Sequence, residues 1–189
     1  MTTTEARDAV KRKFKITVAT LNDDIDECVS TAVDLLSPYV KRPVVDETLT
    51  GVSSSTDSLT LAALVDDVDV RSIYVKGNGL WEKYDDYRRD GNMLLLKSWL
   101  VDGSDVRVFL KVPFTVAEIA QIPAVVTRPM VELACAEFAT TLAGDKSRYN
   151  IYSQATGARA VDNMIDLAEY YEGRAERRLQ KLSDGEGLS

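Results

Sequence analysis

Residues 106–112 have the sequence Val-Arg-Val-Phe-Leu-Lys-Val, in which aliphatic residues occupy every second position. Arg107, Phe109 and Lys111 occupy the positions between them. Because successive side chains of a β-strand point to opposite faces, this alternation predicts a strand with one buried face and a chemically different outer face. The chain of 189 residues is therefore expected to contain a β-sheet, in addition to the helical patterns near its two ends.

The surrounding region, from about 43 to 114, contains further strand patterns separated by turn residues. Its segment 92–101 is apolar on both faces, which is expected of a strand that is sandwiched or covered by another subunit. The polar residues 102–105 are predicted to join that segment to 106–112 as a hairpin loop. Weaker candidates for strands lie at 44–49, 59–61 and 70–75. We therefore expect five to seven short antiparallel strands.

Helical periodicity is found on both sides of the β region. Before it, residues 4–15 are predicted to form a short charged helix and residues 22–36 a longer one, capped by Asn22. After it, Thr127 is predicted to cap a helix that tolerates Pro129 in its first turn. The polar residues 145–157 are predicted to be a loop or broken turn, and residues 159–182 a long final helix.

These patterns predict an α+β protein, in which N- and C-terminal helices pack together as a small helical bundle and an antiparallel β domain is inserted between them. Neither helical part has enough apolar surface to form a domain alone. The expected organisation is an N-terminal helical part at 1–42, the β domain at 43–115, a C-terminal helical part at 116–183 and a flexible tail at 184–189.

The composition excludes several classes of function. The chain contains no histidine, which excludes a histidine general base, a Ser-His-Asp or Cys-His catalytic site and a His-ligated metal. Its 23 basic and 30 acidic residues give a net charge of −7, which argues against tight binding of nucleic acid. No signal peptide or membrane-spanning segment is evident, so we expect a protein that is made and retained in a cytoplasm or built there into a larger particle, with no membrane partner. Cys28 and Cys135 are expected to be free buried thiols.

Three acidic clusters are the candidates for metal binding or acid–base catalysis. They lie at 23–27, at Asp66, Asp67 and Asp69, and at Asp85, Asp86 and Asp90. Paired carboxylates can bind Mg²⁺ or Ca²⁺ or act as a general acid and base. The helix dipole explains the first cluster, and solvated turns and strand edges explain the others. We therefore expect no catalytic residue, metal or cofactor, and a metal-dependent hydrolase that uses the second or third cluster is an alternative.

Two further groups of side chains could contact partners. The first is an aromatic set that could stack bases or form core and subunit contacts: Tyr74, Trp81, Tyr84, Tyr87 and Trp99. Acidic neighbours would repel phosphates, which favours core or subunit contact. The second is a basic cluster in the last turns of the final helix: Arg174, Arg177, Arg178 and Lys181. Cations suit the negative end of a helix, and this cluster also suits docking against an acidic partner surface. Gly173 interrupts the same helix, either at a close helix crossing or as an accidental weak point.

The order of these elements resembles the head-to-tail connector proteins of long-tailed viruses of bacteria and archaea, also called adaptor or head-completion proteins. The resemblance rests on a helix at 23–36, a variable β insertion and a helix that contains Pro129. The last of these continues as Met-Val-Glu-Leu-Ala-Cys-Ala-Glu-Phe-Ala at 130–139, and a long charged helix follows at 159–182.

The resemblance implies a virion protein of the neck, at the head–tail interface. Such a protein is a subunit of a ring, usually of about twelve copies, that docks beneath the portal protein. The ring extends the DNA channel without binding DNA specifically and provides a platform for the stopper or tail-completion protein. The expected portal contacts are Arg174, Arg177, Arg178 and Lys181. The expected contacts between copies are Met93, Leu95 and Trp99, on the segment that is apolar on both faces. A stopper or tail terminator is the alternative position in the neck.

Overall fold

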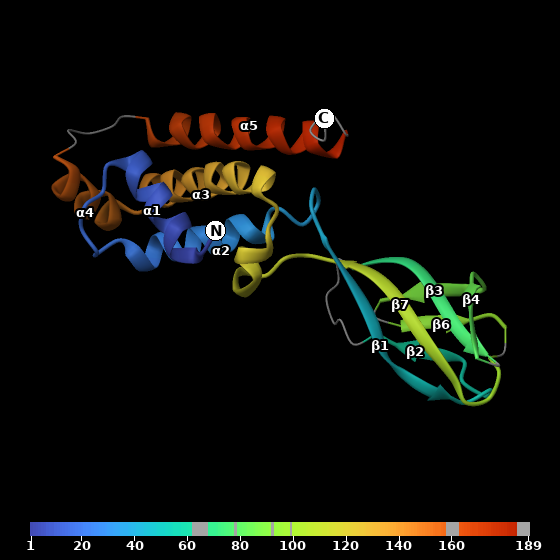
Figure 1. Ribbon diagram of the computed structural model, residues 1–189. Coiled ribbons are helices and arrows are strands. Elements are labelled where there is room, and N and C mark those ends of the chain that lie inside the picture. The colour runs from blue at the N-terminus through green and yellow to red at the C-terminus, as the bar shows by residue number, and fades with distance from the viewer. Residues whose placement is uncertain (62–67, 78, 92, 99, 158–162, 185–189) are drawn as a thin grey trace. The chain divides into compact units, whose positions relative to one another are not determined.

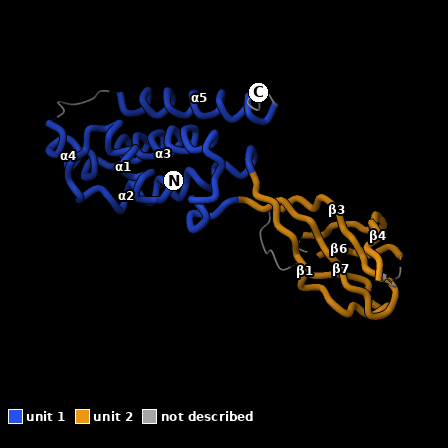
Figure 2. The backbone as a smooth tube through the Cα atoms, viewed as in Figure 1, with its two compact units in different colours: residues 1–40, 114–189 blue, residues 41–113 orange. Residues whose placement is uncertain are grey.

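The computed structural model describes residues 1–61, 68–77, 79–91, 93–98, 100–157 and 163–184. The chain divides into two compact units, of which Met1–Val40 and Phe114–Ser189 form the first and Lys41–Pro113 the second (Figure 2). The predicted α+β class is confirmed, because helices from both ends of the chain pack together and the inserted unit is antiparallel β (Figure 1).

The first unit is built around α3 (Ala124–Gly144), which packs against α2 (Asn22–Asp34) and α5 (Met164–Ser183). The other helices of this unit are α1 (Thr3–Phe14), the 3-10 helix η1 (Val116–Gln121) and α4 (Lys146–Thr156). Buried residues lie on nearly all sides of α3 rather than along one stripe. A helix that is apolar all round is covered all round, which explains its central position.

An aromatic cluster joins α1 to the rest of the unit. Phe14 meets Phe138 of α3 edge-on, with the ring centroids 5.0 Å apart. The Phe14 ring also lies 6.2 Å from the rings of Tyr152 on α4 and Tyr171 on α5. Edge-to-face aromatic pairs add specific geometry to the burial of a large apolar area. Phe14 therefore fixes the N-terminal helix against three helices from the C-terminal part of the chain.

Two predicted helix caps are wrong. Leu21 occupies the cap position of α2 and makes no side-chain cap, while Asn22 Oδ1 accepts a hydrogen bond from Lys11 Nζ at 3.0 Å. Thr127 does not cap α3, because the helix begins at Ala124 and Pro129 lies in its second turn. The Thr127 hydroxyl instead donates to the Ala124 carbonyl at 2.8 Å.

The predicted loop at 145–157 is also wrong, because residues 146–156 form α4. Asp145 Oδ1 accepts from the backbone N–H groups of Ser147 at 2.8 Å and Arg148 at 3.1 Å, as a helix cap does. Gly157 ends the helix with a φ of +65°. These start and stop signals outweigh the polar composition on which the loop prediction depends.

The second unit contains two antiparallel sheets. The larger has the strand order β1–β7–β3–β4, with β1 at Arg42–Val52, β7 at Ser104–Val112, β3 at Asp69–Gly77 and β4 at Leu80–Tyr84. The smaller has the order β2–β6–β5, with β2 at Ser58–Thr60, β6 at Met93–Leu96 and β5 at Tyr87–Asp90. The alternation predicted for β7 is confirmed, because its residues 106, 108, 110 and 112 are buried in a core that the smaller sheet also lines.

The predicted hairpin between 92–101 and 106–112 is wrong, since β6 and β7 belong to different sheets. Leu94 of β6 pairs with Leu59 of β2 and Arg89 of β5. The apolar face of β7 needs a second layer opposite it, and a strand in the other sheet supplies that layer better than a neighbour in the same sheet.

Candidate functional site

The side chains of α5 form three chemically different faces, because positions along a helix repeat every 3.6 residues. The buried face contains Ala168, Ala175 and Leu179. The exposed acidic side chains on an outward face are Glu169, Glu172 and Glu176. The remaining face, called here the basic face, forms a shallow groove of about 480 Å³ lined by Tyr170, Arg174, Arg177, Arg178 and Lys181. Its chemistry suits carboxylates or other anions of a partner.

A buried carboxylate of α3 lies behind the basic face. Glu132 is 5% exposed, and its Oε2 lies 3.0 Å from Arg178 Nε. Its Oε1 lies 3.4 Å from Arg174 Nη2 and 3.5 Å from Arg128 Nε. Glu132 Oε2 makes no hydrogen bond of good geometry, so its contact with Arg178 is an ion pair. A charge so far out of water is tolerated only when opposite charges surround it.

This ion-pair cluster leaves positive charge at the surface. The three arginine side chains are 31–63% exposed, whereas the carboxylate is buried. One buried acid therefore holds α5 against α3 and anchors two arginines of the basic face. Anchored side chains lose less conformational entropy when a partner binds.

Contacts within α5 also position side chains of the basic face. The Arg174 guanidinium lies 5.3 Å from the centroid of the Tyr170 ring and donates a hydrogen bond to the Tyr170 hydroxyl. This hydrogen bond raises the pKa of Arg174. Arg177 Nε donates to the Gly173 carbonyl at 2.7 Å, and Lys181 is exposed.

The four basic residues expected as portal contacts thus lie on one face, although they differ in role. Arg174 and Arg178 form ion pairs with Glu132, whereas Arg177 and Lys181 are exposed. Glu132 is a residue that the sequence reasoning missed. Its signal was the Arg128–Glu132 spacing of four residues, which pairs opposite charges along a helix.

The expected contacts between copies are placed in part. Met93 is 37% exposed and Leu95 is half-buried, on the side of β6 opposite Leu94. Their cross-strand neighbours on β5 are Asp90 and Arg88, so the apolar area is small. Trp99 lies outside the described residues.

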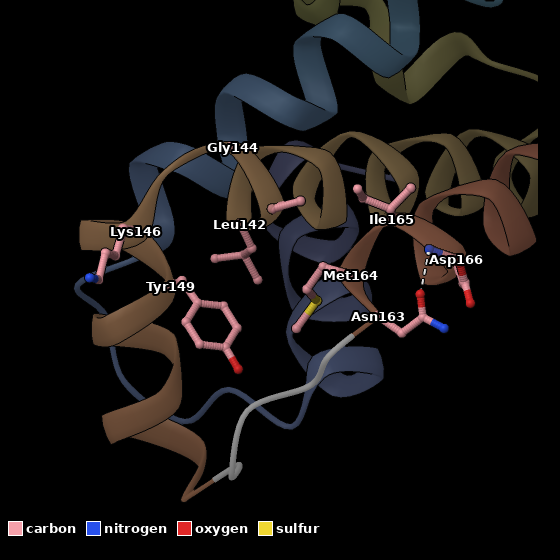
Figure 3. A pocket seen from close by; sticks show the side chains of 9 residues that line it. Leu142, Gly144, Lys146, Tyr149, Asn163, Met164, Ile165 and Asp166 are labelled. Atoms are coloured by element: carbon pink, nitrogen blue, oxygen red, sulfur yellow. Dashed lines mark hydrogen bonds between the residues drawn. The ribbon is translucent and has the colours of Figure 1, made fainter.

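A cavity of about 530 Å³ lies where α3, α4 and α5 meet (Figure 3). Figure 3 shows Tyr149, Leu142 and Met164 around it, with Asn163 accepting a hydrogen bond from the backbone N–H of Asp166 at 3.2 Å. That hydrogen bond caps α5. The lining combines apolar side chains, such as Leu142 and Met164, with the polar side chains of Lys146, Tyr149, Asn163 and Asp166.

Each acidic cluster has at least one member in an ion pair within the chain. Asp24 lies 2.9 Å from Arg148, and Asp26 lies 2.7 Å from Arg7. In the other described clusters, Asp69 pairs with Lys41 and Asp85 with Lys83. Asp66 and Asp67 lie outside the described residues. Among the residues that are described, no group of three His, Cys, Asp or Glu side chains could hold a metal ion.

The aromatic set does not form one surface. Tyr84 and Tyr87 pack against the core of the second unit, and the Tyr84 hydroxyl donates to the Ser98 carbonyl at 2.7 Å. Tyr74 and Trp81 instead lie on the outer face of the larger sheet, where they line a hollow together with Ser72, Arg107 and Phe109. The alternation along β7, which places Arg107 and Phe109 between buried aliphatic residues, was the sequence signal for this outer surface.

No protein-family model and no curated protein matches the sequence. Among solved structures, one chain is similar to 87% of this chain over 87% of its own length, with 10% sequence identity and a TM-score of 0.30. Its structure is described as "Neck of empty GTA particle computed with C6 symmetry". A similarity at this identity and TM-score establishes neither a common fold nor a function. Within the described residues, none of the helices combines the length and the apolar character that a membrane crossing requires.

Proposed function

We propose that this chain is a subunit of a head-to-tail connector, a ring that docks beneath the portal of a tailed-virus particle. The observation that carries the proposal is the organisation of the chain. Helices from 1–40 and 114–189 form one unit, and an antiparallel β unit at 41–113 is inserted between them. This is the order of elements on which the resemblance to connector proteins rests. The work of such a subunit is contact rather than catalysis.

The basic face of α5 is the proposed contact with the portal protein. Arg177 and Lys181 are exposed there, and Glu132 anchors Arg174 and Arg178 beside them. This arrangement fits an acidic surface on the portal, because charge complementarity guides docking and fixes the register of the contact.

The net charge of −7 supports a role beside a DNA channel. A channel through which DNA must slide cannot bind phosphates tightly, and tight binding requires clustered cations that neutralise them. The proposed ring therefore lets DNA pass without specific binding and offers its far side to the stopper or tail-completion protein.

Met93 and Leu95, together with Trp99, are retained as proposed contacts between copies in the ring. Met93 and Leu95 lie outside the core of the second unit, on the side of β6 opposite Leu94. Two adjacent apolar side chains on a sheet surface suit a small contact with a neighbouring copy.

The composition of purified virus particles tests the proposal. Quantitative mass spectrometry with isotope-labelled reference peptides would count the copies of this chain and of the portal protein. The expected result is one ring of this chain per particle, at a copy number close to that of the portal. A chain that is absent from particles, or present in the large numbers of a capsid or tail-tube subunit, contradicts the proposal.

Binding to the purified portal protein tests the proposed contact itself. The variant Arg177→Glu with Lys181→Glu should bind the portal at least tenfold more weakly, because two cations of the basic face become anions. A matched control reverses two exposed basic residues elsewhere, Arg12→Glu with Lys97→Glu. Equal losses in the two variants would mean that net charge, and not the basic face, governs binding.

A further inference from the structure

The outer face of the larger sheet gathers aromatic side chains from neighbouring strands. Phe109 of β7 lies opposite Val45 of β1 and Ser72 of β3, and Arg107 lies opposite Tyr74. Residues paired in this way point to the same side of a sheet. We call this surface the aromatic face, and it consists of Val45, Ser72, Tyr74, Trp81, Arg107 and Phe109. Most of these residues line a hollow of about 320 Å³.

The side chains of the aromatic face are held in place before any partner binds. The Arg107 guanidinium lies 4.2 Å from the centroid of the Trp81 ring, and its Nε lies 2.6 Å from Glu47 Oε1. Tyr74 and Phe109 meet edge to face at 5.5 Å. Tryptophan, tyrosine and arginine are the residue types that dominate binding energy in protein interfaces. Phe109 is nevertheless 37% exposed and Val45, its neighbour across the strands, 43% exposed.

The outer side of the larger sheet carries a small excess of cations, in a chain whose net charge is negative. The outward positions of β3, β4 and β7 include four cations, at Lys76, Lys83, Arg107 and Lys111. The acids on the same side of the sheet are Glu47, Asp105 and Asp69, the last of which lies opposite Lys111. An apolar centre surrounded by cations fits a partner that presents an apolar side chain among carboxylates.

Helix α5 presents such a surface. Ile165 is 62% exposed, and Glu169, Glu172 and Glu176 follow it at steps of four, three and four residues. These steps place all four side chains on one outward stripe, which we call the acidic stripe. Its glutamates make no ion pair with any residue that the structure describes. The stripe is about 17 Å long at 1.5 Å per residue, and four strands of a sheet span about 14 Å.

We infer that the acidic stripe of one copy docks on the aromatic face of the next copy. Each copy then contributes two different patches, and a heterologous contact of this kind closes into a ring when the rotation between copies permits. The inference rests on the proposed ring and assigns one of its interfaces. Single-stranded nucleic acid fits the aromatic face less well, because Glu47 and Trp81 already engage the Arg107 guanidinium that would bind phosphate.

Zero-length cross-linking tests the contact directly. Unlabelled and ¹⁵N-labelled full-length chains would be mixed at high concentration and treated with a carbodiimide, which joins an amine to a carboxylate. The expected result is mixed-isotope cross-links between Lys76, Lys83 or Lys111 and Glu169, Glu172 or Glu176. Mixed-isotope cross-links that join only other pairs of residues would overturn the inference. So would the absence of mixed-isotope cross-links in a sample that sedimentation shows to be self-associated.

Charge exchange gives a second, independent test. The face variant, Lys76→Glu with Lys111→Glu, and the stripe variant, Glu169→Lys with Glu172→Lys, should each self-associate at least tenfold more weakly than the natural chain. A mixture of the two should recover association, because each acidic patch then meets a basic one. The matched control is Lys97→Glu with Asp34→Lys, which exchanges exposed charges outside both patches. Failure of the mixture to recover association contradicts the inference.

The outcomes separate this inference from the proposed function. If the chain forms a ring beneath the portal and neither variant weakens its assembly, the inferred interface is wrong and the connector function stands. A chain absent from particles whose copies still cross-link at these residues overturns the connector function alone. Saturable, salt-sensitive binding of an oligothymidylate that is lost in the face variant would make nucleic acid the occupant and overturn the inference.

Discussion

Arg178 Nε lies 3.0 Å from Glu132 Oε2, and this pair joins the last helix of the chain to the central helix of the first unit. The carboxylate is buried and the guanidinium is partly exposed. The same contact therefore stabilises the α3–α5 packing and presents an arginine to a partner.

The first prediction concerns the charge balance of this cluster. Arg174→Ala with Arg178→Ala should lower the free energy of unfolding by about 3–5 kcal/mol, because the buried Glu132 keeps one of its three arginine partners, the largely exposed Arg128. Adding Glu132→Leu should recover at least half of that loss, since it removes the uncompensated charge. Urea unfolding followed by far-UV circular dichroism measures both effects. Additive losses in the triple variant would mean that the carboxylate is not held by these arginines.

Both tryptophans provide a control for variants of the helical unit. Trp81 and Trp99 lie in the segment 41–113 of the second unit. The midpoint of unfolding followed by tryptophan fluorescence should therefore stay unchanged when only the helical unit is destabilised. The two probes also reveal whether the units unfold separately, in which case a single free energy does not describe the chain.

The second prediction concerns the aromatic cluster. Phe14→Ala should lower the free energy of unfolding of the helical unit by about 3–5 kcal/mol, because it removes a buried ring and leaves a cavity. Phe14→Leu keeps most of the volume and should cost about 1.5 kcal/mol or less. The same urea titrations measure both values. Similar losses in the two variants would show that the edge-on geometry, rather than the volume, is what matters.

The third prediction concerns Gly173. A Cβ added there would meet nothing within 4 Å, so no close helix crossing requires the glycine. Gly173→Ala should therefore raise the free energy of unfolding by about 1 kcal/mol through helix propensity. Gly157→Ala is the matched control and should lower it, because Gly157 has a φ of +65°. Heat denaturation of both variants tests the pair, and destabilisation by Gly173→Ala contradicts the prediction.

The fourth prediction concerns the two free cysteines. Burial raises the pKa of Cys28 to about 11 and that of Cys135 to about 12, from an ordinary value of 9.0. Thiolate, not thiol, is the nucleophile. Neither cysteine should therefore react with Ellman's reagent at pH 8 in the folded chain, and both should react in urea. Rapid reaction of the native chain would contradict the burial of both side chains.

The same pKa shifts predict how stability depends on pH. Unfolded thiols ionise near pH 9, whereas the folded thiols stay protonated until about pH 11. The unfolded state therefore binds fewer protons in this range, and the free energy of unfolding should fall as pH rises above 9. Burial also raises the pKa of Tyr152 and Tyr171, which acts in the same direction. The double variant Cys28→Ala with Cys135→Ala should show a shallower fall, and an unchanged slope would exclude the cysteines as a cause.

Periodicity along the chain predicted the fold class because it reports directly on burial. The alternation in β7 is visible in the sequence, and its aliphatic positions are buried as expected. Sequence pattern did not predict the pairing of strands, since β6 is as apolar as a partner of β7 should be but lies in the other sheet. Strand pairing depends on contacts that are distant in sequence, and local pattern does not report them.

The site was predicted in part for the same reason. The basic residues at 174, 177, 178 and 181 could be placed on one face from their helical spacing. The sequence did not reveal that Glu132, more than forty residues earlier, anchors two of them, because that contact exists only once α3 and α5 pack. Likewise, the aromatic face combines residues of β1, β3, β4 and β7, whose adjacency follows from the sheet order.

A cryo-EM map of the neck of the parent virus particle tests the central claim most directly. The account predicts a ring between portal and tail, in which each subunit contains a helical unit and a two-sheet β unit and α5 faces the portal. It would be contradicted by a map in which other chains account for all the density at that position and this chain occupies none of the neck.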